Sequence, residues 1–170
     1  MLSLTDAQGF CAKNDITYTS YTHPAFFTTQ DSKHYDHIIP GVHTKNLFLM
    51  GKKDGNRHTM LVCLSSHKRL SIKTFGRMLG YKDVSFGSPD MLTSILGLSP
   101  GSVCIFGCIQ TPLPVYMHTD LFTADLVGWH PCINTQTWTF DVPNRRKLYQ
   151  ALKVTPLPFG DELCINEASA

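Results

Sequence analysis

The stretch "GVHTKNLFLM", residues 41–50, predicts the entry to a buried β-strand with a lysine at its polar end. Thr44, Lys45 and Asn46 stand immediately before the apolar run at residues 47–50. A short continuous apolar run next to turn residues is typical of a buried strand. We therefore expect a core strand here, and the question is which group the lysine ammonium binds.

The chain around this strand has 170 residues, the size of one domain. Its net charge is only +2 with the histidines neutral, so a nucleic-acid footprint would have to be a local patch. The segment "MLSLTDAQGF" lacks the basic and apolar regions of a signal peptide, and no apolar run approaches the roughly 20 residues of a bilayer span. We expect a cytoplasmic protein with no membrane partner.

Six cysteines are scattered along the chain without a CxxC motif. In a chain of this length and class, such cysteines are usually small core residues in a reducing compartment. Cys104 and Cys108 are expected on one face of a strand, in the core. A disulfide framework is not expected.

Turn and capping residues divide the chain into alternating helices and strands. Asp54-Gly55 has the chemistry of a two-residue hairpin turn after the quoted strand, and Thr5 with Gln8 and Thr28 with Asp31 fit capping boxes. Helices are expected at residues 5–14, 28–35, 72–79, 89–96 and 144–152, and further strands at 17–22, 60–64, 103–106, 115–118 and 135–140. This order predicts one mixed-sheet α/β domain over residues 1–170, with a loosely held tail after about residue 158.

Common catalytic and metal motifs give little support to other functions. GxGxxG and Walker motifs are absent from the sequence. His34, His37 and His43 have a spacing that could suggest zinc, but no cysteine lies near them, and surface histidines are favoured. Lys45 taken alone is most simply a solvated lysine at a strand edge. We expect neither a metal nor another cofactor.

Three motifs that occur in register change this interpretation: "GVHTKNLFLM" at 41–50, "SFGSPDMLTSILGLSPGSVCIFG" at 85–107 and "GWHPCINTQT" at 128–137. Together they resemble the YbaK/prolyl-tRNA-editing family of free-standing aminoacyl-tRNA deacylases. Within this family, the three motifs resemble most the branch called ProXp-ala (or PrdX). This branch is similar to the editing domain of bacterial prolyl-tRNA synthetase. The resemblance covers about residues 4–155 and implies a mixed, strongly curved β-sheet flanked by helices.

The resemblance also implies an activity and partners. Family members hydrolyse the ester that joins a wrong amino acid to tRNA, and the branch implies Ala-tRNA(Pro) as substrate. Cys-tRNA(Pro) or another small mischarged amino acid is the first alternative, and a non-catalytic module that binds tRNA or a synthetase is the second. The implied partner is the acceptor end of mischarged tRNA(Pro), with prolyl-tRNA synthetase as a further candidate and no DNA.

Site residues follow by matching the motifs. Lys45 matches the essential lysine of the family's TKN motif and Asn46 its neighbour, while His130 matches the histidine of the HP loop. Gly101 and Ser102 match the PGSV loop that borders the aminoacyl pocket. This set suits an activated ester, which needs a positioned water and a stabilised oxyanion more than a strong protein nucleophile.

Contacts to tRNA are expected from basic residues that lie near the quoted strand in the sequence. Each of them could equally be a solvated surface residue. They are Lys52, Lys53, Lys68, Arg69 and Lys73.

Overall fold

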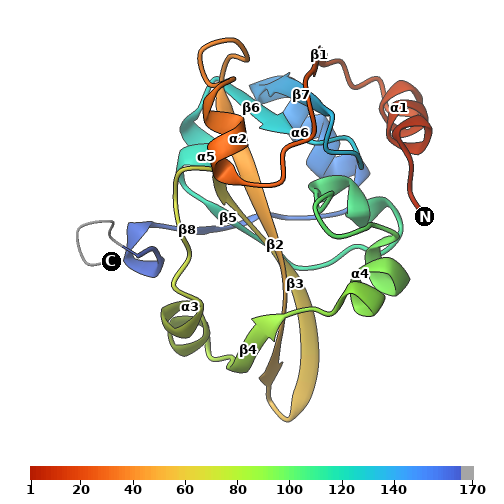
Figure 1. Cartoon of the computed structure of the whole chain (residues 1–170). Helices are drawn as coiled ribbons and strands as arrows, with labels where there is room; N and C mark the ends of the chain where they lie inside the picture. Colours follow the sequence, from red (N-terminus) through yellow and green to blue (C-terminus); the bar gives the residue numbers. More distant parts are fainter. Residues whose placement is uncertain (166–170) are drawn as a thin grey trace.

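A long β-hairpin runs through the computed structural model, which describes residues 1–165 (Figure 1). Strand β2 (Val42–Lys53) pairs antiparallel with β3 (Asn56–Ser65), from Thr44 opposite Ser65 to Lys53 opposite Asn56. Asp54 and Gly55 both have positive φ, at 52° and 78°. Positive φ at both central residues is what a hairpin turn of this hand requires, so the predicted turn is confirmed.

The hairpin belongs to one mixed sheet of eight strands in the order β1-β7-β6-β2-β3-β5-β8, with β4 also paired to β2. The β2/β6, β3/β5 and β5/β8 pairs are parallel, and the remaining pairs are antiparallel. The other strands are β1 (Thr19–Thr22), β4 (Lys82–Phe86), β5 (Val115–His118), β6 (Leu126–Trp129), β7 (Gln136–Asp141) and β8 (Leu157–Phe159).

Helices flank this sheet, which confirms the predicted α/β class (Figure 1). Helix α2 lies beside the upper part of β2, whereas α3 and β4 lie towards the hairpin turn (Figure 1). The α-helices are α1 (Leu4–Lys13), α2 (Thr29–Lys33), α3 (Ile72–Leu79), α4 (Pro89–Leu96), α5 (Asp120–Thr123) and α6 (Val142–Ala151), and the 3₁₀-helices are η1 (Ile105–Ile109) and η2 (Asp161–Leu163).

Local capping signals account for most helix ends. Thr28 caps α2 in a capping box with Asp31, as predicted, and Gly80 and Gly97 end α3 and α4 in the left-handed conformation. The predicted cap of the first helix was wrong. Ser3, not Thr5, is the N-cap of α1, because its hydroxyl accepts from the Asp6 amide while the Asp6 carboxylate accepts from the Ser3 amide.

The strand predicted at residues 103–106 does not form. Residues 105–109 make the buried helix η1 instead, and a short apolar run cannot by itself distinguish these two structures. Cys104 and Cys108 are nonetheless buried in the core as predicted, and all six cysteines are free thiols. Strands β4, β6 and β8 were missed because they are short and β4 is mostly exposed.

The sheet separates two apolar clusters, because successive residues of a strand point to opposite faces. Phe48 packs into the larger cluster and its neighbour Leu49 into the smaller one. Phe159 and Leu163, from the tail for which loose packing was expected, are buried in the smaller cluster. Residues 166–170 of that tail lie outside the described residues. None of the helices between residues 1 and 165 has the length and apolar character that a membrane span requires.

A buried arginine ties α6 to the β6–β7 region. Arg145 is 3% exposed, and its guanidinium donates to the carbonyls of Ala124 (2.6 Å), Asp125 (3.2 Å) and Phe140 (3.1 Å). We expect Arg145→Met to lower the free energy of unfolding by about 1–3 kcal/mol, because the buried Phe140 carbonyl would lose its donor, while the Ala124 and Asp125 carbonyls lie nearer to solvent. Urea unfolding would measure the loss.

The neighbouring Arg146 is exposed on the same helix and provides a matched control. Arg146→Met should change the stability by less than about 0.5 kcal/mol, as surface substitutions usually do. Equal stability of the two variants would show that the carbonyl contacts of Arg145 do not stabilise the fold.

Candidate functional site

One cavity brings together most of the site residues expected from the sequence. Its volume is about 280 Å³, and Lys45, Asn46, Gly101 and His130 all line it. Ser102 does not, because it is buried and its amide donates to the Ser99 carbonyl (3.1 Å). The remaining lining residues are Phe26, Phe27, Thr28, Ser32, His43, Thr44, Ser66, Val103, Gly128 and Thr137.

The cavity lies where β2 has an open edge. One edge of β2 is covered by β3, while the other pairs with β6 only at Val42 and His43 and with β4 only from Leu49 onward. Within the described residues, no strand pairs with residues 44–48 along that second edge. The TKN motif therefore occupies a gap between two strand partners.

Thr44 and Asn46 form part of the cavity wall at this gap. The Thr44 hydroxyl donates to the Gly128 carbonyl (2.8 Å), which continues the attachment of β2 to β6 beyond their backbone ladder. The Asn46 amide in turn donates to the Thr44 hydroxyl (3.3 Å). No sequence pattern indicated this role for Thr44 separately from its neighbours in the motif.

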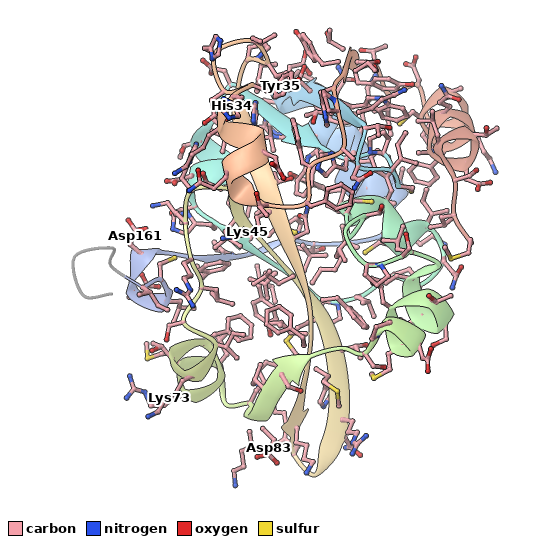
Figure 2. The ribbon with its side chains drawn as sticks, in the orientation of Figure 1. His34, Tyr35, Lys45, Lys73, Asp83 and Asp161 are labelled. Atoms are coloured by element: carbon pink, nitrogen blue, oxygen red, sulfur yellow. The ribbon has the colours of Figure 1, made fainter. Side chains whose placement is uncertain are left out.

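Lys45 is half-buried and is not a solvated strand-edge lysine. Its ammonium donates to the backbone carbonyl of Lys68 in the loop after β3, and Figure 2 shows it near the centre of the molecule. Burial lowers the pKa of Lys45 below its usual range, and the nearby Arg69 guanidinium lowers it further. Both effects disfavour the charged form, so Lys45 is a lysine with a perturbed pKa at a cavity wall.

His130 is held in one orientation by the backbone. Its Nδ1 lies 2.8 Å from the Gln136 carbonyl oxygen, which can only accept, so Nδ1 carries the proton. Burial lowers the pKa of His130, so the ring is neutral at pH 7. Nε2 is then left with a lone pair that can accept a hydrogen bond from a water or a hydroxyl.

His23 and Thr137 support the same wall, and the sequence analysis missed both. His23 is buried, its Nε2 lies 2.9 Å from the Thr137 hydroxyl, and its ring stacks on Phe26 with centroids 3.8 Å apart. Burial also lowers the pKa of His23. The His23-Pro24 pair at the end of a predicted strand was the only local signal that could have singled it out.

Two polar atoms at the cavity have unused hydrogen-bonding capacity. Asn46 Oδ1 and Ser66 Oγ are buried and have no hydrogen-bond partner among the described residues. Both belong to residues that line the cavity. Since buried polar atoms are nearly always hydrogen-bonded, these two mark a wall suited to a polar ligand.

Gly101 is required at the cavity for its backbone conformation. Its backbone φ is +85°, a value that residues other than glycine rarely adopt. A Cβ atom there would meet only Asn134 Nδ2, at 4.0 Å. Space alone would therefore accept a larger residue, and the turn of the loop is what needs glycine.

The histidines considered for zinc do not share one environment. His34 and His37 are exposed, as favoured from the sequence. His43 lines the cavity, where Nε2 lies 2.8 Å from the Ile39 carbonyl and Nδ1 3.2 Å from Asp36.

A different group, His118, Asp161 and Cys164, has its donor atoms within 4.8 Å of one another, and it is the one such group among residues 1–165. A positively charged side chain, that of Lys68, already lies among these atoms. The Lys68 ammonium is 2.6 Å from Asp161 Oδ1, and His118 Nε2 is 3.1 Å from the same oxygen. We interpret the group as an ion-pair network around Lys68.

The five basic residues expected to contact tRNA differ in whether their side chains already have a partner within the protein. Lys52 pairs with Asp83 (3.1 Å) near the hairpin turn, at the end of the molecule away from Lys45 (Figure 2). The Lys53 ammonium donates to the Leu79 carbonyl (3.0 Å). Lys68 is held by Asp161, as above, and also by Asp120 (3.4 Å).

Arg69 and Lys73 are different, because their side chains make no hydrogen bond or ion pair within residues 1–165. Lys73 projects from α3 at the lower edge of the molecule (Figure 2). Arg69 is exposed next to Lys45 and acts on its charge. Of the five residues, Arg69 therefore combines a charge that no described residue pairs with and a position beside Lys45.

Known proteins resemble the chain in sequence and in fold. The family model for the aminoacyl-tRNA editing domain matches residues 23–148. "Prolyl-tRNA synthetase associated domain-containing protein 1" of Danio rerio is 29% identical over 115 residues, which are 68% of this chain. The matched region spans 57% of that relative's length.

Two solved structures share the fold. A scaffold protein from computational epitope backbone grafting has a TM-score of 0.70 at 19% identity, covering 93% of this chain and 97% of that one. A candidate trans-editing enzyme for prolyl tRNA synthetase has a TM-score of 0.68 at 20% identity, covering 93% and 98%. With sequence identities of only 19% and 20%, the structural similarity shows that these proteins share the fold of this chain.

The effect of Arg69 on Lys45 can be measured directly. We expect the pKa of Lys45 to rise in Arg69→Gln, because removing a nearby cation favours the protonated ammonium. An NMR titration that follows the Lys45 ¹³Cε signal through the alkaline range should show a midpoint at higher pH than in the wild type. Lys73→Gln is the control and should leave the midpoint unchanged; an unchanged midpoint in Arg69→Gln would contradict the proximity effect.

Proposed function

Because the chain belongs to the aminoacyl-tRNA editing domain family, we propose that it hydrolyses the ester that joins a wrong amino acid to tRNA. The observation that carries this proposal is the convergence of Lys45, Asn46, Gly101 and His130 on one cavity. These residues come from three segments far apart in the sequence. The proposed partner is the acceptor end of tRNA, with prolyl-tRNA synthetase as a candidate second partner.

In the proposed reaction, a water adds to the ester carbonyl and the ribose oxygen leaves with a proton, which gives the free amino acid and uncharged tRNA. Lys45 carries the positive charge nearest to this reaction and stabilises the developing oxyanion. It uses one of its three donors on the Lys68 carbonyl and so has others for the substrate. His130, through its unprotonated Nε2, orients the water or the vicinal ribose hydroxyl.

We propose Ala-tRNA(Pro) as the substrate, in keeping with the ProXp-ala branch that the three motifs resemble. The names of two similar proteins refer to prolyl-tRNA synthetase, which supports the proline system. A cavity of about 280 Å³ has room for an alanyl group. Discrimination between alanine and a residue one heavy atom larger is worth only about 1–3 kcal/mol, so Cys-tRNA(Pro) is the closest competitor.

We expect the purified protein to hydrolyse Ala-tRNA(Pro) faster than Cys-, Ser- or Pro-tRNA(Pro). Lys45→Ala should lower the Ala-tRNA(Pro) rate on the order of ten- to a hundredfold, because a charge-assisted hydrogen bond to the reacting group is lost. Single-turnover deacylation with labelled amino acid measures both effects.

Lys13→Ala, at the exposed end of α1, is the matched lysine control and should retain the wild-type rate. Circular dichroism would establish that both variants are folded. A folded Lys45→Ala variant with full activity would remove the catalytic assignment, and a wild-type protein inactive on all four substrates would favour the non-catalytic binding module.

We also expect deacylation to be independent of metal ions. The ester is already activated, and the positive charge of Lys45 serves where a Lewis acid otherwise would. Dialysis against a chelator should leave the rate on Ala-tRNA(Pro) unchanged. A loss that zinc restores would contradict this expectation and direct attention to His118, Asp161 and Cys164.

A further inference from the structure

A second cavity adjoins the first at Lys45. Its volume is about 410 Å³, within the range of about 300–1,000 Å³ that is usual for small-molecule sites. Lys45 lines both cavities, so the two adjoin at this residue. The other lining residues are Leu47, Arg69, Leu70, Ile72, Phe86 and Ile165.

Phe86 is an exposed aromatic ring held on a rigid element. It is the last residue of β4, it pairs with Leu49 of β2, and its side chain is 59% exposed. The amide of the next residue, Gly87, donates to the Phe48 carbonyl (3.0 Å), which fixes the chain immediately after Phe86. A fixed, exposed ring at a cavity is the kind of platform on which nucleic-acid bases stack.

Arg69 supplies an available positive charge at the same cavity. Its neighbour Lys68 already neutralises Asp161 and Asp120, and Asp161 lies to the left of Lys45 in Figure 2. The Arg69 guanidinium has no such partner within residues 1–165. A phosphate is the natural ligand for an unpaired guanidinium, because the planar fork can donate two hydrogen bonds to it.

We propose that this second cavity binds the terminal adenosine of the acceptor end, with the base on Phe86 and a phosphate at Arg69. The inference rests on the proposed function, because the ester of an aminoacyl-tRNA lies between the amino acid and the terminal ribose. The ester then falls at Lys45, with the amino acid in the first cavity and the nucleoside in the second.

Phe27 provides the alternative platform against which this proposal is tested. It lines the first cavity and is 80% exposed. If the base stacked on Phe27, nucleoside and amino acid would share one cavity of about 280 Å³, and Phe86 would have no role.

Binding of adenosine 5′-monophosphate, followed by NMR, tests the second cavity without requiring activity. We expect saturable shifts around Phe86 and Arg69, and an affinity weakened about tenfold in Phe86→Leu, as the loss of one base stack implies. Arg69→Gln should weaken it similarly through the phosphate. Phe27→Leu, and Phe122→Leu on α5 as an exposed control that lines neither cavity, should bind as the wild type does.

Hydrolysis of alanyl-adenosine is the second arm. Phe86→Leu should raise KM about tenfold while kcat changes less, since stacking contributes to binding of the nucleoside rather than to the chemical step. Absence of saturable shifts, shifts confined to the surroundings of Phe27, or a larger effect of Phe27→Leu than of Phe86→Leu would overturn the proposal. A wild-type protein that binds the nucleotide at Phe86 but hydrolyses no ester would instead refute the proposed function alone.

Discussion

The pairing of β2 is the constraint on which the rest of the structure depends. β3 covers one edge of β2, while β6 and β4 share the other and leave residues 44–48 between them. A strand partner along this stretch would have covered the backbone and filled the space beside it. Because none does, Lys45 and Asn46 lie on a rigid strand and still face open cavities, which combines fixed geometry with access.

The polar groups beside this gap are costly for the free protein. Lys45 is half-buried next to another cation, and Asn46 Oδ1 and Ser66 Oγ have no hydrogen-bond partner within residues 1–165. Each of these features opposes stability, since burial penalises a charge and an unsatisfied polar atom alike. The apolar packing of Phe48 and Leu49 on opposite faces of the same strand offsets them. Such local costs are expected where a site is kept ready for a polar ligand.

The four predicted residues that line the cavity could be found from the sequence only because their motifs occur together. Lys45, Asn46, Gly101 and His130 each have an ordinary explanation alone, as a strand-edge lysine, a turn residue, a loop glycine and a loop histidine. Ser66 and Thr137 carry no local signal and line the cavity because strands remote in the sequence pair across the sheet, and His23, which contacts Thr137, had only the weak signal of the His23-Pro24 pair. Which of the basic residues has an available charge also depended on distant acidic groups, such as Asp161 beside Lys68 and Asp83 beside Lys52.

The sequence by itself determined the features that depend on neighbouring residues: the Asp54-Gly55 turn, the Thr28 cap of α2, and the glycine ends of α3 and α4. These follow from backbone angles and hydrogen bonds that span at most a few residues. Only the tertiary structure decided that residues 105–109 form a 3₁₀-helix, that the mostly exposed β4 joins β2, and that two cavities meet at Lys45. The reason is that an apolar run or a strand edge acquires its structure from the partner that covers it, and that partner is remote in the sequence.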